Sequence, residues 1–250
     1  MSASPYDVIR VTASNASEYT QDGTNSWIVG SPGCADAVLI DPGPDDPVHL
    51  ASVEAELERR DMRLSDVIVT HAHDDHLGNL WRVALRQPEV RLHSLFTGLP
   101  GCIETSFGEL RVIPTPGHTH DSVMVWGEEA GVLFTGDTAL GDGPTMIDYP
   151  DGSATDYLTS LETALALPGL RAVHPGHGRS RKDAYEVLGW NLAHRRARVD
   201  RVREVADQLH RDAERIVDHC YPGVAPALRP AALQNTQAAL EHLFPSSTGR

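Results

Sequence analysis

The sequence predicts an α+β fold in which strands form sheets and helices cover the outer faces of those sheets. Short β-type runs, separated by turns that contain Gly and Pro, recur over residues 1–180. Segments with a helical spacing of apolar residues flank these runs. From Lys182 onward only the helical spacing continues. These observations predict a core domain over residues 1–185 and a helical C-terminal region over residues 186–250.

The composition is that of a globular chain, and 250 residues can bury one large core. A net charge of −14 argues against broad nonspecific binding of nucleic acid, because such binding depends on neutralising phosphates. No secretory signal opens the chain, no apolar stretch approaches the roughly 18 residues of a membrane span, and the three cysteines lie too far apart for a disulfide framework. We therefore expect a cytoplasmic protein with no membrane association.

In the first half we expect three strands, a helix, a fourth strand and a short helix. The third strand ends at the turn Asp41-Pro42-Gly43-Pro44. The first helix has Pro47 near its start, and Val48, Val53 and Leu57 lie near one face. In chain order, the expected elements are Tyr6–Val11, Ser26–Gly30, Ala37–Asp41, Pro47–Arg60, Asp66–Thr70 and Leu77–Arg86.

The second half repeats the pattern of strands followed by a helix, and the C-terminal region is helical. Apolar residues at helical spacing run from Leu188 to Leu209, and two shorter helices follow. We expect this region to cap or border a site built by the core domain. The expected elements are strands at Leu110–Pro114, Ser122–Trp126, Gly131–Thr135 and Arg171–His174, and helices at Ala154–Leu167, Ala213–Cys220 and Pro230–Phe244.

The strongest functional signal is the run His71-Ala72-His73-Asp74-Asp75-His76, which directly follows the apolar residues Val67-Ile68-Val69. Buried imidazoles and carboxylates are costly unless they are paired or bind a metal. Side chains at this spacing cannot share one helix face, but a loop that leaves a strand end can direct them to a common centre. The run predicts a metal site.

Three further turns each place one potential ligand directly after an apolar strand. Glycine in such a turn lets the backbone approach a shared centre closely, and functional residues gather on loops that a rigid scaffold positions. Together with the histidine run, these turns favour a single metal centre. They are Thr115-Pro116-Gly117-His118-Thr119, Thr135-Gly136-Asp137-Thr138 and Pro175-Gly176-His177-Gly178.

The ordered set of His71-x-His73-x-Asp75-His76, His118, Asp137 and His177 resembles the dinuclear motif of the metallo-β-lactamase superfamily. The resemblance implies a four-layer αβ/βα sandwich with the metals at one edge between the sheets. It implies that His71, His73 and His118 hold the first metal. Asp75, His76 and His177 would hold the second, and Asp137 would bridge both. Asp75 is also the candidate catalytic residue.

Within the superfamily, Gly23-Thr24-Asn25-Ser26-Trp27 and the run from Gly136 to Gly141 resemble the β-lactamase-like protein 2 and glyoxalase II group. The helical tail is similar to the winged-helix-like end of the former. No Gly-Cys-Gly-Arg-type run follows Asp137, which argues against glyoxalase II activity. The short interval between Asp137 and His174 leaves no room for the inserted domain of the β-CASP nucleases.

Neutral imidazoles and carboxylates suit two Zn²⁺ ions, although Fe and Mn use similar donors. Two metals about 3.5–4 Å apart can lower the pKa of a bridging water toward neutrality and polarise a carbonyl or phosphoryl oxygen. No cysteine lies in the four turns, and Asp137 stands where true class B β-lactamases often have Cys. Penicillin hydrolysis is therefore not expected.

Five further residues are candidates for supporting the metal ligands or binding substrate. Asp41 ends a strand in a tight turn and could orient a metal-bound histidine. Asp74 lies inside the histidine run. His194 and Arg195 could reach the site from the helical region, where an arginine can bind a carboxylate or phosphate bidentately. Tyr149 could line the metal cleft.

We therefore expect a metal-dependent hydrolase in which a metal-bridging hydroxide attacks an acyl thioester or related ester, on a small molecule or a carrier. One alternative is a single-strand endoribonuclease, which the resemblance implies and the acidic composition opposes. Another is a mononuclear iron persulfide dioxygenase, which needs mainly His71, His118 and Asp137. A noncatalytic binding module is disfavoured by so complete a ligand set. The sequence leaves the oligomeric state open.

Overall fold

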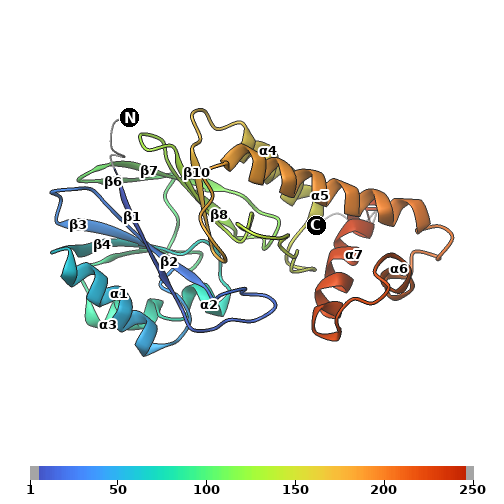
Figure 1. Ribbon diagram of the computed structural model, residues 1–250, viewed down its shortest axis with the longest axis horizontal. Helices are drawn as coiled ribbons and strands as arrows, with labels where there is room; N and C mark the ends of the chain where they lie inside the picture. Colours follow the sequence, from blue (N-terminus) through green and yellow to red (C-terminus); the bar gives the residue numbers. More distant parts are fainter. Residues whose placement is uncertain (1–5, 246–250) are drawn as a thin grey trace.

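The computed structural model describes residues 6–245, and within them two five-stranded sheets face each other with helices on both outer faces (Figure 1). The first sheet has the strand order β1-β2-β3-β4-β5, and the second has the order β10-β9-β8-β7-β6. The expected α+β sandwich with helical outer layers is therefore confirmed. None of the helices in this described part is long and apolar enough to cross a membrane.

In the first sheet, antiparallel pairing joins β1 to β2 and β2 to β3, whereas β3, β4 and β5 run parallel. Helix α1 (Pro47–Arg59) makes the crossover from β3 to β4 and covers the outer face. The Asp46 side chain caps this helix by accepting the Val48 N–H at 2.8 Å. The strands are β1 (Asp7–Thr12), β2 (Asn25–Gly30), β3 (Asp36–Ile40), β4 (Arg63–Ile68) and β5 (Arg91–His93).

In the second sheet, antiparallel pairing joins β6 to β7, β7 to β8 and β8 to β9, whereas β10 lies parallel to β9. Helix α4 (Ala154–Leu165) connects β9 to β10 on the outer face, and Ser153 caps it by accepting the Asp156 N–H. The strands are β6 (Cys102–Thr105), β7 (Gly108–Pro114), β8 (Val123–Gly127), β9 (Val132–Gly136) and β10 (Ala172–Pro175).

Three apolar layers form the core of the sandwich, and a smaller fourth cluster lies within the C-terminal region at Val199, Val202, Ile216 and Ala239. The layer between the two sheets contains Trp27 and Ile40 from the first sheet and Leu110 and Phe134 from the second. A second layer lies under α1, where Val53 and Leu57 are buried as expected, although Val48 is 72% exposed. The third layer lies between the second sheet and the helices α4, α5 (Ala184–Val205) and α7 (Arg229–Leu243).

The C-terminal region is helical, as expected, and projects to one side of the sandwich (Figure 1). It consists of α5 (Ala184–Val205), α6 (Ala213–Cys220), the 3-10 helix η1 (Pro226–Leu228) and α7 (Arg229–Leu243). A boundary at residue 185 falls inside α5, and Leu188 of that helix belongs to the core layer over the second sheet. The helical region therefore shares a core with the sandwich.

The structure differs from the expected element list at three places. The strands β5 and β6 have no counterpart among the expected elements. The short helix expected at Leu77–Arg86 is divided into α2 (Asp74–Leu77) and α3 (Leu80–Arg86). The first of these begins inside the histidine run, because the chain turns directly from the loop after β4 into helical backbone.

Candidate metal centre

Four loops at one edge of the sandwich carry the candidate ligands. They follow β4, β7, β9 and β10. Within the second sheet, β7 and β9 run in the same direction because both are antiparallel to β8, and β10 is parallel to β9. Their carboxyl ends therefore meet at one edge, where the loop after β4 joins them. All seven ligands expected from the sequence lie in these four loops or at the start of α2.

The first group of donors consists of three imidazoles. His73 Nδ1 lies 3.0 Å from His71 Nε2 and 3.2 Å from His118 Nε2. His71 and His118 are buried. A neutral imidazole carries one N–H and one lone pair, so three ring nitrogens that face one another are well suited to surround a cation.

The outer nitrogen of each of these rings has a partner of its own. His71 Nδ1 lies 3.0 Å from Thr70 Oγ1, His118 Nδ1 donates to the Met146 carbonyl at 2.8 Å, and His73 Nε2 lies 3.2 Å from an Asp148 oxygen. Such partners fix the tautomer and orientation of a metal-binding histidine. The inner nitrogens are thereby left to face the centre.

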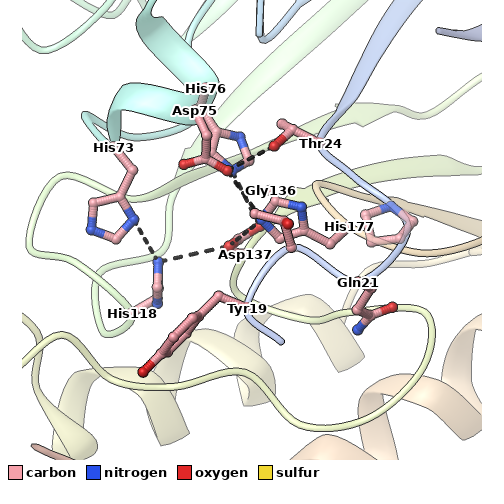
Figure 2. A network of polar contacts seen from close by, with 12 residues as sticks. Tyr19, Gln21, Thr24, His73, Asp75, His76, His118, Gly136, Asp137 and His177 are labelled. Atoms are coloured by element: carbon pink, nitrogen blue, oxygen red, sulfur yellow. Dashed lines mark hydrogen bonds and ion pairs between the residues drawn. The ribbon is translucent and has the colours of Figure 1, made fainter. Parts of the chain in front are cut away.

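The second group of donors consists of Asp75, His76 and His177. His177 Nε2 lies 3.4 Å from Asp75 Oδ2, and His76 Nε2 lies 3.5 Å from the same oxygen. Asp137 connects the two groups, because its Oδ2 lies 3.1 Å from His177 Nε2 and 3.9 Å from His118 Nε2. Figure 2 shows Asp137 lying between His118 and His177.

Two buried atoms of the cluster have no hydrogen-bond partner among the described residues. They are His76 Nε2 and Asp137 Oδ1, which lie 3.6 Å apart. A buried polar atom without a partner costs about 1–3 kcal/mol. A divalent cation at this point would contact both atoms, so the donor set fits a metal.

The charges of the cluster favour the same interpretation. Burial and the neighbouring imidazoles hold the pKa of His71 well below its ordinary value. Burial alone would raise the pKa of Asp137, but His177 and His76 bring it well below the usual range. Burial alone would lower the pKa of His76, yet Asp137 and Asp41 raise it to about 10. The carboxylates thus stabilise positive charge at a buried point, which a metal ion can supply.

Close approach explains two glycines of the loops. A Cβ on Gly176 would lie 2.3 Å from Asp137 Oδ1 and 2.6 Å from His76 Cε1. A Cβ on Gly136, which has φ +47°, would lie 2.7 Å from Thr70 Oγ1. Glycine is therefore required at both positions for the backbone to approach the donors.

Asp41 lies directly behind the cluster. Its Oδ2 accepts a hydrogen bond from His76 Nδ1 at 2.8 Å and another from the Thr70 hydroxyl, also at 2.8 Å. Its Oδ1 accepts the Thr70 N–H at 2.7 Å. The carboxylate therefore contacts a proposed metal ligand on the side away from the centre, which is the position that an orienting residue requires.

The structure does not bring the other four supporting candidates to the donors. Asp74 is exposed, and Tyr149 borders a separate cavity beside α7. His194 stacks on Trp190, and burial together with Arg198 lowers its pKa to about 4. Arg195 is buried, and its guanidinium donates to Asn235 Oδ1 and to the Thr145 carbonyl. His194 and Arg195 lie away from the cluster because α5 packs against α4 and α7.

Several residues near the cluster were not singled out from the sequence. Thr24 donates its hydroxyl proton to Asp75 Oδ2 at 2.7 Å (Figure 2). Met146 and Asp148 contact His118 and His73 from the loop after β9. Thr24 belongs to the run Gly23-Thr24-Asn25, which carried part of the family resemblance. No spacing or motif distinguished Met146 or Asp148.

A cavity of about 520 Å³ opens over the donors. The loop between β1 and β2 forms one wall, and Figure 2 shows its residues Tyr19 and Gln21 beside the cluster. The Tyr19 hydroxyl donates to the Ala227 carbonyl at 2.8 Å, which connects this loop to the C-terminal region. Helices α5 and α7 supply the opposite wall with Arg198, Ala231 and Ala232. The volume is that of a small-molecule site.

The layered fold and its His/Asp donor set are those of a four-layer sandwich protein with a candidate metal centre. The sequence profile of the metallo-beta-lactamase superfamily matches residues 19–97 and 85–177, so the chain belongs to this superfamily.

Among curated relatives, a beta-lactamase-like protein 2 homolog from Caenorhabditis elegans is 27% identical, over 94% of this chain and 83% of its own length. This confirms the group that the sequence resembles. An atrochrysone carboxyl ACP thioesterase from Aspergillus fumigatus is 29% identical, over 79% of this chain and 48% of its own length.

Solved structures support the fold. A metallo-beta-lactamase family protein from Thermus thermophilus has a TM-score of 0.70 at 21% identity, covering 96% of this chain and 93% of its own. A beta-lactamase domain protein from Burkholderia ambifaria has a TM-score of 0.73 at 19% identity, covering 96% of this chain and 86% of its own. The similarity to both extends through the C-terminal helices.

Proposed function

We propose that this protein is a dinuclear, zinc-type hydrolase that cleaves an acyl thioester or a related ester. The main support is that two donor groups meet at Asp137 and face one cavity. We assign His71, His73 and His118 to the first metal. We assign Asp75, His76 and His177 to the second, with Asp137 bridging. The donors suit Zn²⁺ best, and Fe or Mn could replace it.

When bound, two such metals would lower the pKa of a bridging water and polarise the scissile carbonyl. The residues of the chain orient the reactants. Thr24 holds Asp75 Oδ2, which lies 3.4 Å from His177 Nε2, so this carboxylate can orient the attacking water and accept its proton. Leu140 and Met146 give the cavity an apolar wall that suits an acyl chain.

The thioester substrate class has support from relatives. Two fungal proteins that match about four-fifths of this chain are named atrochrysone carboxyl ACP thioesterase and thioesterase pkgB. We therefore propose an acyl group on a carrier as the substrate. The cysteines Cys34, Cys102 and Cys220 are all free thiols, which supports our placement of the protein in the reducing cytoplasm.

Metal content and turnover test this proposal. Purified protein is expected to contain close to two zinc-like ions per chain and to release thiol from acyl-carrier and acyl-coenzyme A thioesters. One iron per chain with oxygen uptake would support the persulfide dioxygenase instead. Cleavage of labelled single-stranded RNA that is lost in Asp75→Ala, without any thiol release, would support the endoribonuclease.

His118→Ala is expected to abolish thioester turnover, because it removes one of the three imidazoles that surround the first metal position. Its circular dichroism spectrum is expected to remain that of the wild type. His120→Ala is the matched control, since His120 lies in the same turn but is exposed and pairs with Asp151. Retained turnover in His118→Ala would refute the ligand assignment.

A further inference from the structure

One positively charged side chain lines the cavity above the donors. Arg198 of α5 is the single Lys or Arg among the described residues of the cavity wall. No carboxylate among residues 6–245 forms an ion pair with it, although most arginines of this acidic chain have such a partner. A half-buried guanidinium that faces a cavity without an acidic partner is a binding group for an anion.

The position of Arg198 is held by an aromatic ring. Its guanidinium carbon lies 4.9 Å from the centre of the Tyr221 ring, and that of Arg201 lies 5.8 Å from the same centre. Stacking of this kind orients a guanidinium while leaving its N–H groups available. The low pKa of His194, to which Arg198 and Arg201 contribute after burial, reflects the positive charge gathered here.

The remaining wall restricts the kind of ligand. Apart from Asn235, the lining residues of α7 and of the segment before it are apolar: Val224, Leu228, Ala231 and Ala232. Asp142, an acid of the wall, already pairs with Arg179. The cavity thus offers a metal-donor cluster, a largely apolar wall on the side of the C-terminal helices and a single cationic group, with Glu18 as a further acid on the loop between β1 and β2.

We propose that Arg198 binds the phosphate at the end of a phosphopantetheine arm while the thioester at the other end of the arm lies over the metal centre. This inference rests on the proposed thioesterase function. The pantetheine arm is uncharged between its thioester and its phosphate, which suits the apolar residues that line the same cavity as Arg198 and the donors. A nucleic-acid backbone would need several cations, since its affinity grows with each phosphate that is neutralised.

Substrates that differ only at the phosphate test the proposal. We compare the same acyl group on pantetheine and on 4′-phosphopantetheine. The wild type is expected to have a kcat/KM about tenfold or more higher for the phosphorylated thioester, as is typical of a hydrogen bond to a charged group. Arg198→Gln is expected to remove this preference, so that its kcat/KM values for the two thioesters become equal. Arg198→Lys, which keeps the charge without the planar fork, should retain part of it.

The control variant is Arg196→Gln. Arg196 lies on the same helix but is exposed and pairs with Glu162 at 2.6 Å, so its replacement removes the same charge from outside the cavity. It is expected to keep the full preference. Loss of the preference in both variants would show a general effect of net charge and would overturn the assignment to Arg198.

A binding measurement separates this proposal from the proposed hydrolase function. Calorimetry compares the S-methyl thioethers of pantetheine and 4′-phosphopantetheine, which cannot be hydrolysed. Tighter binding of the phosphorylated probe that Arg198→Gln abolishes would support the subsite even if no thioester is cleaved. Equal binding of both probes to the wild type would overturn it. The subsite would also be overturned if Arg198→Gln weakened the binding of a single-stranded RNA oligonucleotide but not the binding of the phosphorylated probe.

Acyl-coenzyme A and an acylated carrier protein distinguish the two sources of the arm. Both present the same phosphate next to pantetheine, so Arg198→Gln is expected to lower kcat/KM for both. The substrate with the larger loss identifies the carrier that the site recognises. An unchanged kcat/KM for both would contradict the proposal.

Discussion

Asp41 has a backbone conformation that few residues other than glycine adopt, with φ +57°. Asn and Asp tolerate this left-handed region better than other side chains. The conformation directs the buried carboxylate toward both His76 and Thr70. A residue outside the donor set thus fixes the orientation of one donor.

Asp41→Asn is expected to weaken metal binding at the centre by about 10–100-fold, as is usual when the partner of a metal-binding histidine is changed. Asparagine keeps the size and the backbone preference but removes the charge that faces His76. Competition with a chromophoric chelator measures the affinity. Asp61→Asn is the matched control, because Asp61 has φ +55° but is exposed. Equal affinities in wild type and Asp41→Asn would show that the contact does not act on the metal.

At the scale of single residues, the sequence predicted the seven donors because they recur as short motifs at strand ends. Thr24 and Asp148 could not be predicted in the same way. Each is a single residue of a common type, and each reaches the cluster only because distant segments fold together. Arg198 and Arg195 show the related difficulty on a helix. Three positions separate them, and only the packing of α5 decides which one is buried and which faces the cavity.

Short strands were the elements that sequence patterns missed. β5 and β6 have three and four residues, which is too few to show an alternation of apolar and polar side chains. In β4, the fully buried Asp66 interrupts the apolar pattern. It is paired with Arg91 and His93 of β5 at 2.7 and 2.8 Å. Because this buried carboxylate is paired with the neighbouring strand, the apolar pattern did not reveal that β4 begins at Arg63.

The strand β10 carries a histidine that makes stability depend on pH. His174 packs between Trp27 and Phe134, and burial lowers its pKa to about 4. The unfolded chain, with an ordinary histidine pKa near 6.5, binds the proton more readily. The folded state is therefore favoured above pH 6.5 and loses stability as the pH falls from that value toward 4.

His174→Gln is expected to remove this dependence. The difference in unfolding free energy between wild type and variant should fall by about 2 kcal/mol between pH 7.5 and 5, because each pKa unit corresponds to about 1.4 kcal/mol. Urea unfolding at several pH values measures it. His219→Gln on α6, where the side chain is exposed, is the control and should leave the difference constant. A constant difference for His174→Gln would contradict the explanation.

Helices α5 and α7 meet at the loop that supports the first donor group. Asn235 Oδ1 accepts hydrogen bonds from Arg195 and, at 3.1 Å, from the Ile147 N–H. The neighbouring Met146 carbonyl accepts from His118. The helical region thus contacts the metal centre indirectly, through one loop.

Asn235→Ala is expected to lower the unfolding free energy by about 2 kcal/mol or more, because it leaves buried donors on Arg195 and Ile147 without their acceptor. It should also weaken metal binding, since the loop that orients His118 loses its anchor. Urea unfolding and chelator competition measure the two effects. Gln237→Ala, on the same helix, should change neither, because the Gln237 side chain forms no hydrogen bond within residues 6–245. Lost stability with unchanged metal affinity would limit the role of Asn235 to packing.

At the scale of the whole molecule, the sandwich and the C-terminal helices share a core layer, and we expect them to unfold as one cooperative unit. Val187 and Leu188 of α5 and Ala238 of α7 share a core layer with Ile147 and Tyr157. Burial of a large apolar side chain contributes about 1.5–3 kcal/mol, and a domain is stable by only about 5–15 kcal/mol in total. Loss of the helices would therefore remove an amount comparable with the whole stability.

A chain that ends at residue 185 is accordingly expected to be unfolded or aggregated, although it contains all seven proposed donors. In the complete chain, urea unfolding followed by tryptophan fluorescence and by far-ultraviolet circular dichroism should give coincident transitions. The two probes differ in what they report, because the buried Trp27 and Trp126 lie in the sandwich and the exposed Trp190 of α5 changes its surroundings less on unfolding. Much of the helix, in contrast, lies in α5 and α7. A soluble 1–185 chain that binds metal, or two separated transitions in the complete chain, would show that the sandwich folds without the helices.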